Sequence, residues 1–429
     1  MSYPLVRECI AKGVHFSSIT DKKFKHNRIS VNLAVKLDRE KVTDRAVVPF
    51  ILRQGTRKCP EFTKLNEKLC DLYGASIDAG IDKFGEYQVI CLGIFGLDSR
   101  FALEGEDMVC ECAELLSDIV LDPNIVDGHF DEKATEIEKE YILDTIDSEI
   151  NDKRTYSMVR CKDIMCENET CDIKKYGYRE DALKITGTSA AKAYADLIRT
   201  AQVEILFEGC GDPEKAKEIF RRKFSAIERE PITVNSYCGK KQQGDIKEVT
   251  EKLDVKQGKL VMGFRVEDVT DYKDMNAERI AVALLGGTPN SLLFKNVREK
   301  MSLCYYCAAR YDRNTGLMMV DSGVEAENAV KTKDAVLAQL AMMQKGQIED
   351  QDIEETILFL KTALKATTDS LGAMNSWYLA QILGQTECSP DMEIDLCSHI
   401  TKEAIVRAAN SIKLDTVYML MPQDEKEKE

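Results

Sequence analysis

The chain has 429 residues, of which 44% are hydrophobic and 31% charged, a composition typical of a soluble globular protein long enough to form two domains. Its formal net charge of -15 and the lack of a long Lys/Arg cluster argue against nucleic acid as a partner. No apolar run reaches the roughly 20 residues that cross a bilayer, and the N-terminal MSYPLVRECIAKG lacks the apolar core of a signal peptide, so we expect a cytoplasmic protein without a membrane partner.

In the first half, alternating apolar and polar residues predict strands, and apolar residues three or four apart predict helices. The predicted strands are VHFSSIT, ISVNLAVKL, ASIDAGIDKF, EYQVICLGIF and AQVEILFEG. Predicted helices follow at EFTKLNEKLCDLYGA, at EDMVCECAELLSDIVLD and from about Phe130 to Asn151, with further helix to about Thr200. A last helix is expected to begin with Asp212 as its cap and Pro213 in its first turn.

The second half repeats this plan. Its predicted strands are GKLVMGFRV, CYYCAARYD, GLMMVDSGV and DTVYMLM, and its predicted helices are AERIAVALLGG, PNSLLFKNVREK, residues 327–345, residues 350–382 and TKEAIVRAAN. The pattern predicts an α+β fold with two homologous domains, each a mixed, mostly antiparallel β-sheet with helices packed on one face. We expect the domains to span residues 1–230 and 245–429, joined by the polar stretch EREPITVNSYCGKKQQGD.

Two stretches indicate a family. LLGGTPNSLLFKNVREKMSLCYY resembles the second-domain signature of the insulinase or pitrilysin-type (inverzincin) zinc peptidases, which include mitochondrial processing peptidase. ILRQGTRKCPEFTKLNEKLCDLYGASIDAG is similar to the segment of the same family in which the catalytic helix ends at a Gly-Thr. The resemblance covers nearly the whole chain and implies a peptidase-like domain in each half.

The zinc motif of that family is missing. In active members, H-x-x-E-H precedes the Gly-Thr, and two histidines bind zinc while the glutamate activates water. Aligning the motif on Gly55 and Thr56 places it on Ala46, Val47, Val48, Pro49 and Phe50. The third ligand of the family, a glutamate on a later helix, aligns with Asp144 or Thr145. Because a zinc site needs three protein ligands, the resemblance implies a pseudoenzyme with no metal and no cofactor.

Pro49 also bears on the catalytic helix. In the middle of that helix a proline would remove one backbone hydrogen bond and disturb it, whereas a helix that begins at Pro49 would tolerate it.

Arg298 and Tyr305 remain at second-domain positions where the metal-free subunits of two-subunit members often keep an Arg and a Tyr. The resemblance implies that these residues bind the substrate backbone or the developing oxyanion in the site of a partner subunit. Arg supplies a fixed charge and several donors, and a Tyr hydroxyl donates one hydrogen bond. The alternative is structural: Arg298 pairs with a local carboxylate and Tyr305 fills the face of the sheet.

Within the family, KFKHNRISVNLAV, VTDRAVVPFILRQGT and KLCDLYGASI resemble the bacterial YfmF-like proteins, which are metal-free and usually accompanied by a zinc-bearing YfmH-like subunit. The resemblance implies a heterodimer with a zinc-bearing homologue, or a homodimer, that binds or processes a peptide substrate. It also implies a link to the 5-aminopentanol modification of elongation factor P. The alternative function is a binding or assembly protein with no proteolytic role, like the core subunits of respiratory complexes in the same superfamily.

The cysteines predict no metal or redox site. Their number, 15, is odd and they are scattered, which favours reduced thiols over a disulfide framework. Cys304 and Cys307 form a C-x-x-C within a predicted strand, where residues three apart are expected to face opposite sides. Cys161, Cys166 and Cys171 recur every fifth residue, which is a poor ligand spacing on one helix.

Overall fold

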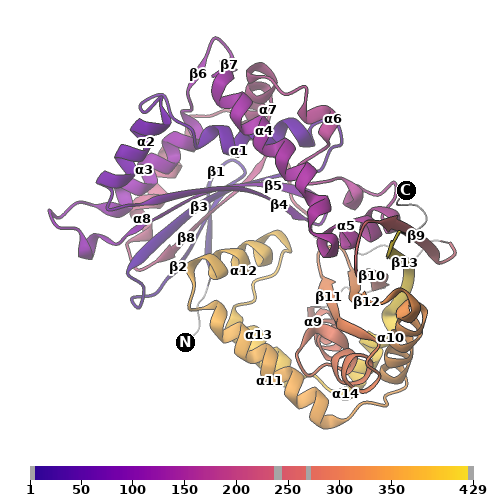
Figure 1. Ribbon diagram of the computed structural model, residues 1–429. Helices are drawn as coiled ribbons and strands as arrows, with labels where there is room; N and C mark the ends of the chain where they lie inside the picture. Colours follow the sequence, from indigo (N-terminus) through magenta and orange to yellow (C-terminus); the bar gives the residue numbers. More distant parts are fainter. Residues whose placement is uncertain (1–4, 236–243, 267–271, 424–429) are drawn as a thin grey trace. The chain divides into compact units, whose positions relative to one another are not determined.

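The computed structural model describes residues 5–235, 244–266 and 272–423. The chain forms two compact units, and each takes one segment from the other half of the sequence (Figure 1). Unit 1 consists of Met1–Asp147, Ile173–Ser236 and Thr367–Ser389. Unit 2 consists of Ser148–Asp172, Tyr237–Ala366 and Pro390–Glu429.

Unit 1 contains a six-stranded sheet with the strand order β1-β2-β8-β3-β5-β4. All neighbours in this sheet are antiparallel except β2 and β8, which are parallel. The strands are β1 (Val6–Ala11), β2 (Val14–Thr20), β3 (His26–Lys36), β4 (Ser76–Phe84), β5 (Tyr87–Leu97) and β8 (Gln202–Gly209). A small hairpin, β6 (Ile125–Val126) and β7 (His129–Phe130), lies outside the sheet. The mixed, mostly antiparallel sheet predicted from the sequence is confirmed.

Most helices of unit 1 belong to one layer on this sheet. They are α1 (Val42–Leu52), α2 (Phe62–Asp71), α3 (Met108–Leu121), α4 (Glu132–Ser148), α6 (Arg179–Ala182), α7 (Gly187–Thr200) and α8 (Pro213–Ser225). Ile29, Val31 and Leu33 alternate along β3 and lie in the same buried cluster as apolar side chains of α1, α3, α7 and α8. Alternation along β3 thus directs one row of side chains to the helical layer, as the sequence pattern predicts.

The opposite face of this sheet is covered by a single helix from the second half of the sequence, α12 (Leu371–Leu383) (Figure 1). Met374 and Tyr378 of α12 share a buried cluster with Ala34 of β3 and Leu206 of β8. The contact is also polar, because the Asn375 side-chain amide donates to Ser30 at 2.7 Å and to Glu208 at 3.1 Å. Unit 1 therefore needs α12 to bury the second face of its sheet.

Glu208 gives this contact a pH dependence. Burial raises the pKa of Glu208 to about 8, against the lowering effects of the Asn375 hydrogen bond and the Arg28 charge. Between the pKa of Glu208 in the unfolded chain and its higher pKa in the folded chain, the unfolded chain is ionised at this carboxyl while the folded chain keeps the proton. In this pH range the free energy of unfolding therefore falls with rising pH, by up to about 1.4 kcal/mol per pH unit. We expect Glu208→Gln to remove this pH dependence. In urea unfolding, the free energy of unfolding of the variant relative to that of the wild type should therefore rise by a few kcal/mol between about pH 5 and about pH 8.

Glu204→Gln is the matched control, because Glu204 lies on the same strand and is equally buried. Burial alone would raise the pKa of Glu204, but hydrogen bonds from His15 and Arg7 and their charges lower it below its usual value. The contribution of Glu204 is present above the unfolded pKa and is lost as pH falls, so Glu204→Gln should be most harmful at high pH. The same pH trend in both variants would contradict the interpretation of Glu208.

Unit 2 contains a five-stranded sheet with the order β11-β12-β10-β13-β9, in which only β13 and β9 are parallel. The strands are β9 (Lys247–Leu253), β10 (Gly258–Val266), β11 (Cys304–Asp312), β12 (Leu317–Val324) and β13 (Ile412–Pro422). The helical segments are α9 (Tyr272–Val282), the π-helical turns η4 (Ala283–Gly287) and η5 (Leu293–Lys300), α10 (Ala329–Gln344), α11 (Asp350–Thr367), α13 (Pro390–Ser398) and α14 (Lys402–Ser411).

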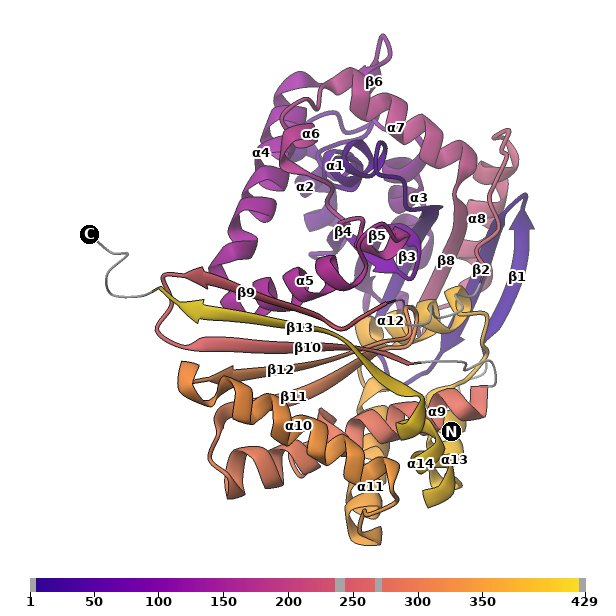
Figure 2. The same ribbon diagram turned by 90° about the vertical axis from the view of Figure 1, so that its right-hand side faces the viewer.

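A helix from the first half of the sequence, α5 (Lys153–Met165), packs on β10 and β13 of unit 2. Figure 2 shows α5 on one side of this sheet and α10 on the other. Cys161 of α5 shares a buried cluster with Val261, Tyr418 and Leu420. Each sheet therefore receives one covering helix from the opposite half of the sequence.

One predicted helix is modified by the structure. The single helix predicted over residues 350–382 is two helices, because the Ser370 hydroxyl accepts the Ala373 N–H and starts α12 anew. The domains 1–230 and 245–429 remain our proposal for the two homologous repeats, and the linker between them lies partly outside the described residues. None of the helices in the described ranges is both long and apolar enough to cross a bilayer.

Candidate functional site

Helix α1 holds the residues that the sequence analysis aligned with the zinc motif, and its side chains are packed into the core. Ala46 is 0% exposed and Phe50 is 2% exposed. The Phe50 ring meets the Tyr141 ring of α4 edge-on, with centroids 4.9 Å apart, and the Arg53 guanidinium lies 5.5 Å from the Phe50 centroid. The two positions that the sequence analysis aligned with histidines thus carry apolar residues that pack in the core.

Pro49 lies inside α1, seven residues after its start at Val42, so the helix does not begin at the proline. Pro49 has no N–H to donate to the Arg45 carbonyl, but its own carbonyl accepts the Arg53 N–H at 3.3 Å. The helix therefore continues through Pro49 to Leu52, and the position that the sequence analysis aligned with the catalytic glutamate carries no polar side chain.

On α4, the aligned third-ligand position is also unsuited to zinc. The Thr145 hydroxyl donates to the Tyr141 carbonyl at 2.7 Å, and Asp144 is exposed. Sequence reasoning missed Glu138, a carboxylate that is only 2% exposed and hydrogen-bonded by the Gln54 side chain. Its signal was present, since Thr135, Glu138 and Ile142 form one buried face of α4. One carboxylate and no imidazole do not fit a catalytic zinc ion.

Only one group of three potential metal ligands occurs among the described residues, and it lies in unit 2. The ligand atoms of Cys166, Glu169 and Cys171 lie within 4.8 Å of one another. The expectation that these cysteines share a helix is wrong, because α5 ends at Met165 and the chain then turns back. Arg265 binds Glu169 at 2.7 Å, and the Cys171 hydrogen bond and burial raise the pKa of Cys166. The group is therefore a buried cluster of thiols around an ion pair.

The structure brings Arg298 and Tyr305 together. Arg298 lies on η5 and Tyr305 on β11, the edge strand of the unit 2 sheet. The Arg298 Nε donates to the Tyr305 backbone carbonyl at 3.0 Å. The Tyr305 residue is 60% exposed and the Arg298 side chain 39% exposed, so both are accessible on the surface of unit 2.

A β-bulge explains why Tyr305 points outward. In the pairing of β11 with β12, Cys304 lies opposite Val324 and Tyr306 opposite Gly323, so Tyr305 is an extra residue. Bulges redirect a side chain and are frequent next to active sites. Tyr305 does not fill the face of the sheet, contrary to one of the alternatives left by the sequence.

Local partners hold both side chains. The Tyr305 hydroxyl donates to Glu325 at 2.6 Å, and this hydrogen bond raises the pKa of Tyr305, so the hydroxyl stays protonated. Arg298 pairs with Glu299 at 3.2 Å, as the structural alternative expected. The geometry therefore provides two donors that are positioned but already engaged by exposed carboxylates.

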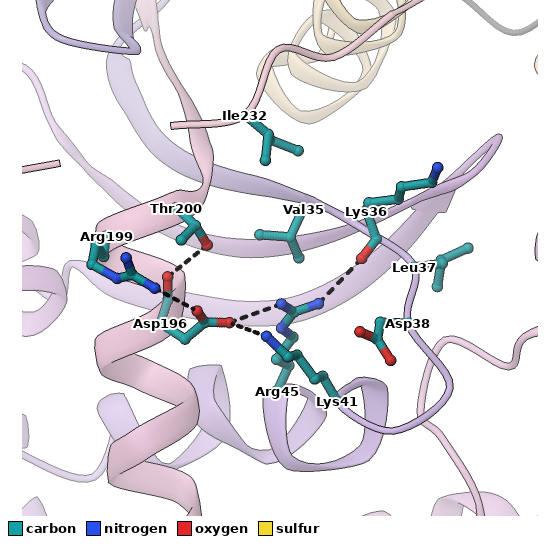
Figure 3. Close-up of a pocket in the computed structure, with 10 residues that line it drawn as sticks. All are labelled: Val35, Lys36, Leu37, Asp38, Lys41, Arg45, Asp196, Arg199, Thr200 and Ile232. Carbon is teal, nitrogen blue, oxygen red and sulfur yellow. Dashed lines mark hydrogen bonds and ion pairs between the residues drawn. The ribbon is translucent and has the colours of Figure 1, made fainter. Parts of the chain in front are cut away.

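A pocket of about 340 Å³ in unit 1, beside α1, has a largely charged lining (Figure 3). Asp196 of α7 accepts from Arg45 of α1 at 2.9 Å and pairs with Lys41 at 3.4 Å. Burial alone would raise the pKa of Asp196, but these cations lower it. The charges satisfy one another and join α7 to α1, so this pocket has a structural explanation.

A second cavity of about 430 Å³ lies where α1 ends, beside α2 and the start of β4. Arg53, Gln54 and the half-exposed Phe62 line it together with Ser76 and Ile77 of β4. Because β4 is the edge strand of the unit 1 sheet, this cavity opens beside backbone groups that have no strand neighbour in the sheet.

The comparisons with known proteins agree with this arrangement. Residues 184–360 match the family described as Peptidase M16 inactive domain. The chain is 30% identical over 423 residues to "Probable inactive metalloprotease YmfF" of Bacillus subtilis, covering 98% of both chains. The chain belongs to the peptidase M16 family. The sequence analysis named the subgroup YfmF-like, whereas this relative is named YmfF.

Solved structures share the M16 fold over the full chain. A conserved protein from Enterococcus faecalis has a TM-score of 0.89 and 25% identity, covering 98% of this chain and 99% of its own. A protease from Helicobacter pylori has a TM-score of 0.80 at 13% identity, covering 98% of this chain and 100% of its own. The expected recognition of the family and of the α+β fold is thereby confirmed.

Proposed function

We propose that the chain is a non-catalytic subunit of an M16 metallopeptidase that pairs with a zinc-bearing homologue and helps it to bind or process a peptide. The proposal places this pair in the cytoplasm and links it to the modification of elongation factor P, as the resemblance to the YmfF-like group implies. No disulfide joins the cysteines that the structure describes, which suits a reducing compartment.

The observation that carries the proposal is the composition of α1. Its motif positions present Ala46, Pro49 and Phe50, none of which can bind a metal or accept a proton. A chain with this helix has no means to activate water for peptide hydrolysis at the family's site. The M16 fold is nevertheless kept over the whole chain, which supports a role that needs the fold and not the zinc.

Two edge strands support peptide binding. β4 ends the sheet of unit 1 and β11 ends the sheet of unit 2. An extended peptide can add to an edge strand through main-chain hydrogen bonds, while neighbouring pockets select its side chains. The cavity beside the start of β4 is large enough, at about 430 Å³, to take such a side chain.

Arg298 and Tyr305 support a role in trans. Their donors lie on one exposed edge, and the side chain of Tyr305 is turned outward by the bulge. The carboxylates that hold them, Glu299 and Glu325, are themselves on the surface, so a substrate oxygen can replace them at small cost. The pair is thus suited to bind a peptide carbonyl or an oxyanion in the site of a partner.

The test mixes the purified chain with the zinc-bearing homologue of the same organism. We expect the chain alone to hold no stoichiometric zinc and to cleave no quenched fluorescent peptide, whereas the mixture cleaves faster than the homologue alone. Arg298→Ala should lower the rate of the mixture roughly ten-fold or more, because a positioned donor is lost. Arg221→Ala is the matched control, since the Arg221 side chain is similarly exposed, at 40%, and lies on α8 of unit 1.

The outcomes separate the parts of the proposal. An unchanged rate with Arg298→Ala would remove the role in trans, and zinc at full occupancy with hydrolysis by the chain alone would overturn the non-catalytic assignment. The link to elongation factor P predicts a change in the mass of that factor. Elongation factor P isolated from cells that lack the gene for this chain should lack the mass of its modification. An unaltered mass would remove that link.

One observation favours the alternative function, a binding or assembly protein with no proteolytic role. Arg298 and Tyr305 already have local partners in Glu299 and Glu325, so these contacts explain the positions of both side chains without a substrate. In that case the chain forms a stable complex with its homologue, but the mixture cleaves peptide no faster than the homologue alone.

A further inference from the structure

Cys304 and Cys307 of β11 lie on the same side of the strand, although residues three apart on a regular strand point to opposite faces. The bulge at Tyr305 changes this relation. Cys304 is opposite Val324 and Cys307 is opposite Ser322, and these two partners are two residues apart on β12. The two side chains therefore lie on the same side of the strand, and each thiol shifts the pKa of the other. The sequence-based expectation that they point apart is wrong because it assumed an unbroken strand.

The two thiols have different surroundings. Cys307 is buried, with 6% of its surface exposed, whereas Cys304 is partly exposed beside Arg298. The hydrogen bond from Cys307 lowers the pKa of Cys304, and the Arg298 charge acts in the same direction. The same hydrogen bond, together with burial, raises the pKa of Cys307. The outer sulfur is thus the better nucleophile and the inner sulfur keeps its proton.

We propose that Cys304 and Cys307 form a peroxide-sensitive dithiol, in which Cys304 is oxidised first and Cys307 resolves the product as a disulfide. The Cys304 thiolate attacks hydrogen peroxide: an S–O bond forms, the O–O bond breaks, and hydroxide leaves and takes up a proton as water. The Cys307 sulfur then attacks the Cys304 sulfur: the S–S bond forms, the S–O bond breaks, and the second hydroxide leaves with the Cys307 proton as water. The two thiols lose two electrons and the peroxide gains them.

Four other cysteines lack this combination. Cys9 and Cys70 are more exposed, but neither lies beside another thiol in the contacts of the described chain. Cys166 and Cys171 adjoin each other, but both are buried. An accessible thiol with a resolving thiol behind it is the arrangement that redox-sensitive cysteines share.

The test treats the reduced full chain with increasing hydrogen peroxide, blocks the remaining thiols with iodoacetamide and maps the peptides by mass spectrometry. We expect the peptide holding Cys304 and Cys307 to lose two hydrogens and escape alkylation at peroxide concentrations roughly ten-fold below those that oxidise Cys9 and Cys70. These two exposed cysteines are internal controls, because oxidation that followed exposure alone would reach them first.

Two variants assign the roles of the thiols. In Cys307→Ser the disulfide cannot form, so dimedone should trap sulfenic acid at Cys304; in Cys304→Ser, Cys307 should stay reduced because it is buried. Equal oxidation of Cys304 and Cys9 in the wild type, a dimedone adduct at Cys307 of Cys304→Ser, or no adduct at Cys304 of a folded Cys307→Ser would each overturn the proposal. The wild-type comparison needs no substitution and remains decisive if a variant fails to fold.

Discussion

Residues 1–230 expressed alone are expected not to reach a stable fold, because they lack α12, the helix that covers one face of the unit 1 sheet. The buried apolar side chains that α12 contributes are Met374, Tyr378, Leu379, Ile382 and Leu383. Burying such a side chain stabilises by about 1.5–3 kcal/mol, so their loss costs on the order of 10 kcal/mol. A typical domain is stable by only about 5–15 kcal/mol.

The measurement is a urea or thermal transition followed by near-UV circular dichroism, with binding of an apolar dye as a second readout. A fusion of residues 367–389 to the end of 1–230 through a Gly/Ser linker is the matched control, since it restores α12 and changes nothing else. The fusion should recover a cooperative transition that the shorter fragment lacks. Identical transitions for the two fragments would mean that α12 is dispensable for unit 1.

Arg229→Met is expected to lower the free energy of unfolding by about 3–5 kcal/mol, because Arg229 is a buried cation whose guanidinium donates to four backbone carbonyls. Arg229 is 2% exposed. Its guanidinium donates to the carbonyls of Ile198 at 2.7 Å, Lys12 at 3.0 Å and Gly13 at 3.3 Å, and also to that of Ala201. Burial lowers the pKa of Arg229 to about 10, so it remains charged at neutral pH. Methionine fills the volume but leaves these carbonyls without their donor.

Urea unfolding of the full chain checks this expectation. Arg229→Lys should be intermediate, since one ammonium group cannot reach the carbonyls at both ends of the guanidinium. Arg221→Met, on the exposed side of the preceding helix α8, should change the free energy of unfolding by less than about 0.5 kcal/mol. A loss at Arg229 no larger than the loss at Arg221 would show that these carbonyls find other donors or water.

The elements themselves follow well from the sequence. The apolar spacing of Met108, Val109, Cys112, Leu115 and Leu116 predicts α3, and all five side chains are buried in the core. The alternation along ISVNLAVKL predicts β3 and its two faces. Local periodicity fixes these elements because each one buries a single face.

The assignment of helices to sheets does not follow from periodicity. The sequence predicts helix over α5 and α12, but nothing local indicates that each covers a sheet of the opposite half. The break at Ser370 was missed as well, since a serine in a helical pattern gains its capping role only when the next helix packs elsewhere. Long-range packing decides both features.

The roles expected of Arg298 and Tyr305 stay a prediction. Resemblance to a motif led to Arg298 and Tyr305, and the structure brings them together through a hydrogen bond. The same reasoning overlooked Cys304 and Cys307, because the bulge that joins them depends on the pairing of β11 with β12 and has no sequence pattern of its own. Glu138 was overlooked because a charged helix such as α4 resembles a solvated surface.

The origin of α12 also sets an order of events during translation. Unit 1 has all of its strands once β8 leaves the ribosome, but α12 is made roughly 160 residues later, which takes about ten to thirty seconds at ordinary elongation rates. For that interval the nascent sheet exposes Ala34 and Leu206 to solvent. Chaperone capture is therefore most valuable to this chain before its final forty or so residues emerge.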